Sequence, residues 1–266
     1  MASRAELHEA AIAGALLGPA PVPASLPEPP TIRAALRAAL KDFYFHSWRL
    51  LPANVLWTAV LLILVGLAIL VPPLLILLPL AALPLAGIFR IATRIVRGRS
   101  VSFWDGMSAW RGEVRPALLL GAGVLAATTV LGFNLLTGIL SDTLPGWAFA
   151  TLAFWGLVGT WLYAWVAWPI LLDPDRATQT VRERLRLAAL LLLAHPVRVG
   201  ALGVVLAALL VVSAIAIVAL VTVSVGFSAL VASRYVLPAA DRLESRLAGP
   251  RSGHRAASTL EIDTPV

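Results

Sequence analysis

Residues 90–116 read RIATRIVRGRSVSFWDGMSAWRGEVRP and lie between two long apolar segments. The stretch carries six arginines, at positions 90, 94, 97, 99, 111 and 115. Positively charged side chains next to membrane spans bias a loop toward the cytoplasm. We therefore predict that this loop is cytoplasmic. Arg94, Arg97 and Arg99 are expected to anchor the topology and to face lipid or a partner.

A short helix is predicted inside this loop. Ser102 and Asp105 have the S-x-x-D spacing of a capping box, which would start a helix at Phe103. Apolar side chains recur along it at i, i+4 and i+7, so they form one stripe. The helix would lie in the headgroup layer or dock a partner, or its aromatics would pack on the bundle as in an ordinary loop. The candidates for contact with lipid or a partner are Phe103, Trp104, Met107 and Trp110.

The composition is that of an integral membrane protein. Hydrophobic residues make up 59% of the 266-residue chain and charged residues only 13%. A helix needs about 20 apolar residues to cross a hydrocarbon layer about 30 Å thick. Each block that lacks Asp, Glu, Lys and Arg can hold at least one span, which predicts an all-α, polytopic membrane helix bundle. These blocks are 53–89, 117–141, 143–172 and 199–233.

Several functional classes have no support in the sequence. The net charge is +7, but the basic residues are scattered, which favours a role in topology and attraction to anionic lipid over nucleic-acid binding. Cysteine is absent, and the four histidines have no metal-site spacing. We find no phosphate-binding glycine loop and no nucleophile elbow. We therefore expect no enzyme, no cofactor and no metal site. Because nearly all basic residues are arginine, a bacterial inner membrane is the expected location.

The chain divides into a membrane domain between two tails. Residues 1–31 are proline-rich and are expected to be disordered, as is the tail 249–266; the helical membrane domain is 32–248. An amphipathic interfacial helix should begin at Thr31, ahead of the spans. Asp173-Pro174 predicts the start of a second interfacial helix that ends at Pro196. The first four spans are expected at about 52–71, 74–93, 117–140 and 147–172.

The block 199–233 decides the number of spans. As one helix its 35 residues would reach about 52 Å, and as two spans it allows only about 17 residues each, so length alone is inconclusive. With two spans, all 21 basic residues fall on one side of the membrane. We therefore predict six transmembrane helices with both termini in the cytoplasm, the alternative being one tilted helix and five spans.

Two polar or aromatic features lie within the predicted spans. Asn134 is the most suggestive intramembrane polar residue, because an amide in hydrocarbon must find a partner, in the bundle or in a substrate. In the fourth span, Trp161, Trp165 and Trp168 share one helix face. They would either form a wall on which a substrate stacks or pack against lipid and the core.

The aromatic first helix running into NVLW, the proline-broken hairpin and AGIFRIATRIVRGRSVSFWDGMSAW together resemble the YesL-like family of bacterial membrane proteins. The resemblance is strongest over residues 43–115. It implies five or six helices and no assigned active site, with a link to carbohydrate uptake. We therefore expect a non-enzymatic accessory or assembly protein that contacts the bilayer and a carbohydrate transporter or another membrane protein. The alternative is a small-solute permease component with an uncharged pathway along Asn134 and the tryptophans.

Overall fold

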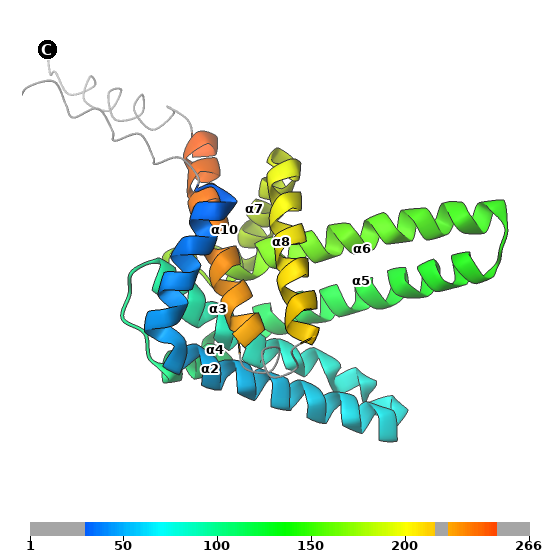
Figure 1. Ribbon diagram of the computed structural model, residues 1–266, viewed down its shortest axis with the longest axis horizontal. Coiled ribbons are helices and arrows are strands. Elements are labelled where there is room, and N and C mark those ends of the chain that lie inside the picture. The colour runs from blue at the N-terminus through cyan, green and yellow to red at the C-terminus, as the bar shows by residue number, and fades with distance from the viewer. Residues whose placement is uncertain (1–29, 216–222, 249–266) are drawn as a thin grey trace, which may run out of the picture.

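A computed structural model of the chain describes residues 30–215 and 223–248. These residues form helices and no strand, so the predicted all-α membrane bundle is confirmed (Figure 1). The elements are α2 (Ile32–Leu70), η1 (Pro72–Ala81), α3 (Ala82–Val96), α4 (Phe103–Gly112), α5 (Val114–Leu140), α6 (Leu144–Leu171), η2 (Pro174–Arg176), α7 (Val181–Ala194), α8 (Pro196–Ile215) and α10 (Val225–Ala248). Both predicted tails lie almost wholly outside the described residues.

The first interfacial helix and the first span are one continuous helix, α2. Thr31 caps it, because the Thr31 hydroxyl accepts a hydrogen bond from the Ala34 backbone N–H at 3.2 Å. The predicted separation into two elements is therefore wrong. Pro52 lies inside α2, where it removes one backbone hydrogen bond, and α2 changes direction along its length (Figure 1).

The second span begins as a 3₁₀-helix. Pro72 and Pro73 open η1 and Pro79 lies within it. Prolines lack the N–H that an α-helix needs, and the tighter 3₁₀ winding accommodates them until α3 begins at Ala82.

The third and fourth spans, α5 and α6, form a hairpin that projects away from the other helices (Figure 1). The turn is tight: Asp142 has a φ of 48°, and the Thr143 hydroxyl accepts from the Gly146 N–H at 3.2 Å. A Cβ on Gly146 would lie 2.7 Å from the Gly138 carbonyl oxygen, so only glycine permits this approach.

The helix predicted to start at Asp173 starts later. Asp173 caps only the short η2, and α7 begins at Val181 with Thr180 as its N-cap. Thr180 and Glu183 form a complete capping box: the Thr180 N–H donates to Glu183 Oε2 at 2.8 Å, and the Glu183 N–H donates to the Thr180 hydroxyl at 3.3 Å. Pro196, predicted to stop this helix, is the first residue of α8.

Residues 199–215 belong to α8 and residues 225–233 to α10, and the directions of these two helices exclude one tilted helix through the block. Arg198 at the start of α8 and Arg242 near the end of α10 line the same groove, so α8 and α10 run in opposite directions (Figure 1). Within the described residues, five helices are long and apolar enough to cross a membrane, and α10 is not among them. Only residues 225–233 of α10 precede its first charge, Arg234, so the sixth crossing stays a prediction.

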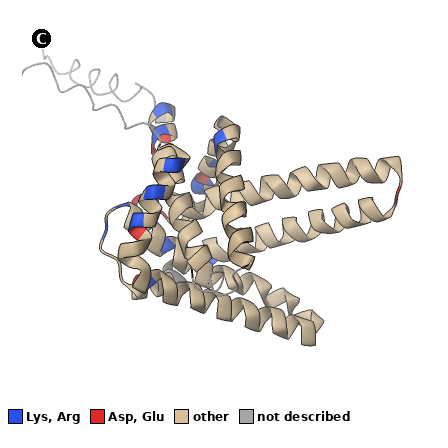
Figure 2. Cartoon of the chain, in the orientation of Figure 1, with Lys and Arg blue, Asp and Glu red and all other residues tan. Residues whose placement is uncertain are grey.

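The charged side chains gather at one end of the bundle, around the start of α2, the start of α8 and the end of α10 (Figure 2). The apolar helices extend away from that end, and an acidic residue marks the tip of the α5–α6 hairpin. This distribution agrees with the charge pattern on which the predicted topology rests.

We expect a cysteine replacing Ala216 to be labelled, and a cysteine replacing Ser258 to be protected, when intact cells meet a membrane-impermeant thiol reagent. Both positions lie outside the described residues, and the chain has no native cysteine to give a background. The physical reason is that α8 and α10 are antiparallel and the basic residues favour the cytoplasm. Labelling at position 258 would place the C-terminal tail outside and contradict six spans.

Candidate functional site

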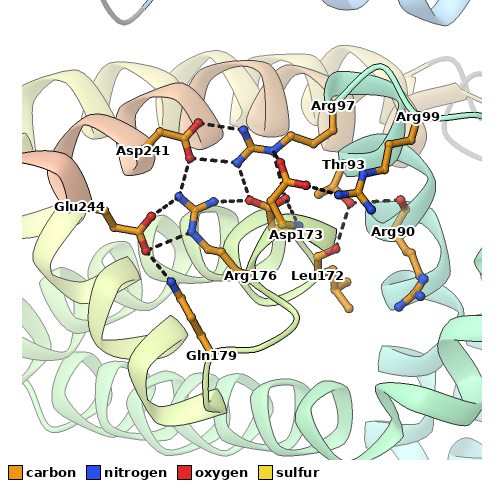
Figure 3. Close-up of polar contacts among 11 residues, drawn as sticks. Arg90, Thr93, Arg97, Arg99, Leu172, Asp173, Arg176, Gln179, Asp241 and Glu244 are labelled. Carbon is orange, nitrogen blue, oxygen red and sulfur yellow. Dashed lines mark hydrogen bonds and ion pairs between the residues drawn. The ribbon is translucent and has the colours of Figure 1, made fainter. Parts of the chain in front are cut away.

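The main polar feature of the described chain is a buried ion network at the charged end (Figure 3). It joins three regions far apart in sequence: the end of α3, the link around η2, and the last part of α10. Its members are Arg97, Arg99, Asp173, Asp175, Arg176, Asp241 and Glu244.

Asp173 is the centre of the ion network. Its side chain is 0% exposed, and both carboxylate oxygens accept hydrogen bonds from Arg97, from Nε at 3.1 Å and from Nη2 at 2.6 Å. Arg176 donates to the same carboxylate, and the Asp175 N–H donates to it at 3.2 Å. These donors satisfy the hydrogen-bonding capacity that the buried carboxylate would otherwise have lost on leaving water.

Arg97 and Arg176 connect this centre to α10. Arg97 donates to both oxygens of Asp241, at 2.8 and 2.9 Å. Arg176, only 3% exposed, donates to Asp241 at 2.6 Å and to Glu244 at 2.7 Å, and Gln179 donates to Glu244 at 2.9 Å. Each guanidinium therefore binds carboxylates from two different elements, a geometry that suits its planar fork of donors.

The ion network lowers the pKa of Asp241. Burial tends to raise the pKa of Asp241, but Arg97 and Arg176 outweigh burial and hold that pKa below its usual range. Because the pKa is lower in the folded state, these ion pairs stabilise the fold at neutral pH. Their contribution is lost as the pH falls through the depressed pKa.

Further hydrogen bonds hold the link between α6 and α7. The buried Arg184 donates to the Leu171 carbonyl at 2.5 Å and to the Gln179 carbonyl at 3.0 Å. Thr93 of α3 donates to the Leu172 carbonyl at 3.0 Å. These bonds satisfy carbonyls at the end of α6 and so fix the segment that presents Asp173.

Half of the predicted capping box of α4 is present, because the Ser102 N–H donates to Asp105 Oδ2 at 2.6 Å. The Ser102 hydroxyl accepts from the Trp104 N–H at 3.4 Å, and the Asp105 N–H donates to the Ser102 carbonyl at 3.1 Å instead of to that hydroxyl. Asp105 also forms an ion pair with Arg94 at 2.7 Å. Arg94, Arg97 and Arg99 thus all pair with acids of the same chain, and their predicted contact with lipid or a partner stays untested.

The helix α4 packs on the bundle. Phe103 packs against the core, and a Cβ on Gly106 would lie 2.8 Å from Ile91 of α3, so the two helices are in close contact. Met107 is half-buried, whereas Trp104 is 72% exposed and remains available to lipid or a partner. The side chain of Trp110 lies outside what the structure describes. For Phe103 and Met107, packing on the bundle is therefore the better of the two interpretations.

A cavity of about 740 Å³ lies among α2, α3, α5, α6, α8 and α10. Among the described residues that line it, four are tryptophans and none is charged. Its size and lining are those of small-molecule pockets, which are mostly apolar with few polar groups. Its main aromatic residues are Trp57, Phe89, Trp161, Trp165 and Trp168.

The cavity tryptophans also pack on one another. Phe89 stacks on Trp168 with ring centroids 5.8 Å apart, and Trp161 meets Trp165 edge to face at 5.4 Å. The Trp161 indole N–H contacts the Gly203 carbonyl at 3.4 Å. The Trp57 indole N–H is shielded and has no acceptor within the described chain. Packing in the core is thus observed for the tryptophan face, and a wall on which a substrate stacks stays a prediction.

Asn134 is not a bundle contact. It is exposed on α5, and its side chain has no hydrogen bond within residues 30–215 and 223–248. The amide that bonds between helices is Asn54, which is fully buried on α2 and accepts from the Gly226 N–H of α10 at 3.0 Å. Like Asn134, Asn54 lies inside a predicted span, 52–71, so only its packing partner distinguishes the two amides.

Sequence analysis missed the acidic half of the ion network. Sequence analysis interprets Asp173 only as the start of a helix and assigns no role to Asp241. A clue was present: Asp173 follows a long apolar block directly, where an unpaired carboxylate would be costly to bury. No group of metal-binding side chains occurs in the described part of the chain.

Replacing the buried Arg176 by methionine should destabilise the protein by about 3–5 kcal/mol, because Asp173 is left buried with fewer partners. Replacing Arg99 by methionine should cost about 0–1 kcal/mol, since Arg99 and its partner Asp175 are 49% and 42% exposed. Thermal unfolding of the detergent-solubilised variants measures both. Equal losses of stability in the two variants would show that the burial of an ion pair does not determine how much it stabilises the protein.

Comparison with known proteins identifies no relative. No family model matches the chain, and neither the curated proteins nor the solved structures contain a significant match. The resemblance to the YesL-like family therefore stays a prediction. The helices of the described chain identify it as a multi-pass, all-α membrane protein.

Proposed function

We propose that this chain is a non-enzymatic accessory or assembly protein of the bacterial inner membrane, of the YesL-like type. In this proposal it binds another integral membrane protein through the α5–α6 hairpin. The single observation that carries the proposal is the exposed amide of Asn134, which lacks a partner in the described chain.

The environment of Asn134 makes a partner necessary. It lies in the charge-free block 117–141, between Phe133 and Leu136, which are both exposed. An amide in hydrocarbon without a hydrogen bond is costly, and transmembrane helices satisfy such groups by bonding to another helix. A helix of a second protein would supply that bond.

The hairpin is also suited to association by its shape. It extends beyond the rest of the bundle, so a partner can reach both of its helices (Figure 1). Glycines on α5 let a neighbouring backbone approach closely, because Gly123 and Gly132 have open space where a Cβ would lie. The resemblance suggests a carbohydrate transporter as the partner.

A photo-crosslinking amino acid in place of Phe133, next to Asn134, tests this proposal in native membranes. We expect one discrete protein adduct, reduced about fivefold by Asn134→Leu, which corresponds to about 1 kcal/mol for an interhelical hydrogen bond. Asn134→Gln should retain most of the adduct. The control is a crosslinker replacing the exposed Val204 of α8. Lipid adducts alone, or equal yields from all variants, would contradict the proposal.

The tryptophan-lined cavity favours a second candidate, a small-solute permease component. The cavity offers stacking surfaces without any charge, as an uncharged pathway for sugars or similar solutes would require. Its lining combines Trp57 and Trp168 with the hydroxyl groups of Thr128 and Thr160.

Flux of a sugar panel into liposomes containing the purified protein tests this candidate. Uptake that falls at least tenfold in Trp161→Ala would support a permease, because that indole lines the cavity. Exposed Trp155 of α6 provides the matched control, Trp155→Ala. If no sugar crosses, the permease candidate fails, and the accessory role does not depend on it.

A further inference from the structure

A groove of about 490 Å³ lies at the charged end, between the start of α2, the start of α8 and the last turns of α10. It is separate from both the ion network and the tryptophan cavity. No carboxylate of residues 30–215 and 223–248 lines it. Its ionisable lining residues are His195, Arg198, Tyr235, Arg242 and Arg246.

Helix α10 separates its charges between two faces. Its acids Asp241 and Glu244 point into the ion network, where Arg97 and Arg176 bind them (Figure 3). Its arginines at positions 242 and 246, four residues apart, line the groove instead. These two carboxylates of α10 are thus engaged on the side of the helix away from the groove.

The arginines contributed by α8 and by the end of α10 are available to an anion. Arg198 and Arg246 are exposed, and neither forms an ion pair with any residue in the described ranges. Tyr235 is buried and lines the groove, and its hydroxyl has no hydrogen-bond partner among those residues. Two guanidinium groups and a phenol supply the donors that a phosphate group prefers.

Backbone donors add to this cationic lining. Val197 and Arg198 belong to the first turn of α8, whose N–H groups have no acceptor inside the helix. The first turn of α2 adjoins the same groove through Thr31 and Ile32. The positive ends of two helix dipoles therefore meet where the arginines lie.

An apolar track continues from the groove along α8. Val197, at the groove, is exposed, and so are Val204 and Val211, which follow at seven-residue intervals on the same face. A free phosphate ion would make no use of this track, whereas an acyl chain would cover it. Basic pockets beside membrane helices suit anionic lipid headgroups.

We propose that this groove binds the phosphate headgroup of an anionic phospholipid, with an acyl chain lying along the apolar track of α8. Arg198 and Arg246 hold the phosphate oxygens from opposite helices, and Tyr235 donates to one of them. The site is independent of any partner on the α5–α6 hairpin, so this proposal and the accessory role can fail separately.

The experiment uses the full chain in mild detergent and follows its melting temperature. The probes are dihexanoyl phosphatidylglycerol, dihexanoyl phosphatidylcholine and inorganic phosphate. A ligand that binds only the folded state raises the melting temperature in a saturable manner. We expect saturation with phosphatidylglycerol at a concentration at least tenfold below that needed with phosphatidylcholine, and no shift with inorganic phosphate.

We define the midpoint as the lipid concentration that gives half of the maximal rise in melting temperature. The variant Arg198→Gln/Arg246→Gln should raise the midpoint for phosphatidylglycerol at least tenfold. The matched control Arg182→Gln/Arg186→Gln removes the same charge from the exposed face of α7, outside the groove, and should leave the midpoint unchanged. Both arginines of the first variant are exposed, so its melting temperature without lipid should equal that of the wild type. If the double variant does not fold, Arg198→Gln alone carries the test.

Three outcomes would overturn the proposal. Equal midpoint shifts in the two double variants would show that the protein's overall charge, and not the groove, determines the response to phosphatidylglycerol. An equal response to inorganic phosphate would assign the groove to a free anion and not to a lipid. An unchanged midpoint in Arg198→Gln/Arg246→Gln would show that phosphatidylglycerol binds elsewhere.

Discussion

The ion pairs that Asp173 forms with Arg97 and Arg176 are the constraint on which the charged end of this protein depends. Asp173 has lost all contact with solvent, and a buried carboxylate is tolerated only with close, well-oriented cationic partners. Arg97 and Arg176 meet that need and each also binds Asp241 of α10. Three distant segments therefore have one permitted arrangement relative to one another.

This arrangement determines the surfaces around it. Because Asp241 and Glu244 are drawn into the ion network, the opposite face of α10 presents arginine to the groove. Because Arg97 holds the end of α3, the loop that follows returns α4 to the bundle, where Gly106 contacts Ile91. Arg94 and Asp105 secure the same loop from its other end. The charges of this loop thus have a structural role besides any role in topology.

Much of the fold could be predicted from the sequence, because hydrocarbon imposes a simple rule on segment length and charge. The apolar blocks correspond to the long helices, and the cap at Ser102 is where the spacing placed it. The prediction was less successful where tertiary contacts decide. Asp173 caps only η2 and binds Arg97 and Arg176, whereas Thr180 starts α7 with its own capping box.

The candidate sites were harder to predict than the spans. A polar residue in a span needs a partner, but sequence does not say which helix face it occupies. Asn54 proved to be the interhelical contact, whereas Asn134 is exposed on the hairpin. In the same way, the positive-inside rule predicts on which side of the membrane Arg97 lies but not which acids it binds. Its partners Asp173 and Asp241 lie 76 and 144 residues further along the chain. The tryptophan cavity was foreseen only as one helix face, since its other walls come from five further helices.

The position of α10 in the chain has a consequence for biogenesis. A ribosome makes the segment with Arg97 first, then Asp173 and Arg176, and Asp241 last. Until translation reaches α10, the nascent bundle holds an incomplete set of charges, and the amide acceptor of Asn54 has no Gly226 to bind. A truncated product would therefore display Arg97 and Arg176 without the carboxylate of Asp241. Membrane proteases could distinguish it from the finished protein by that chemistry alone.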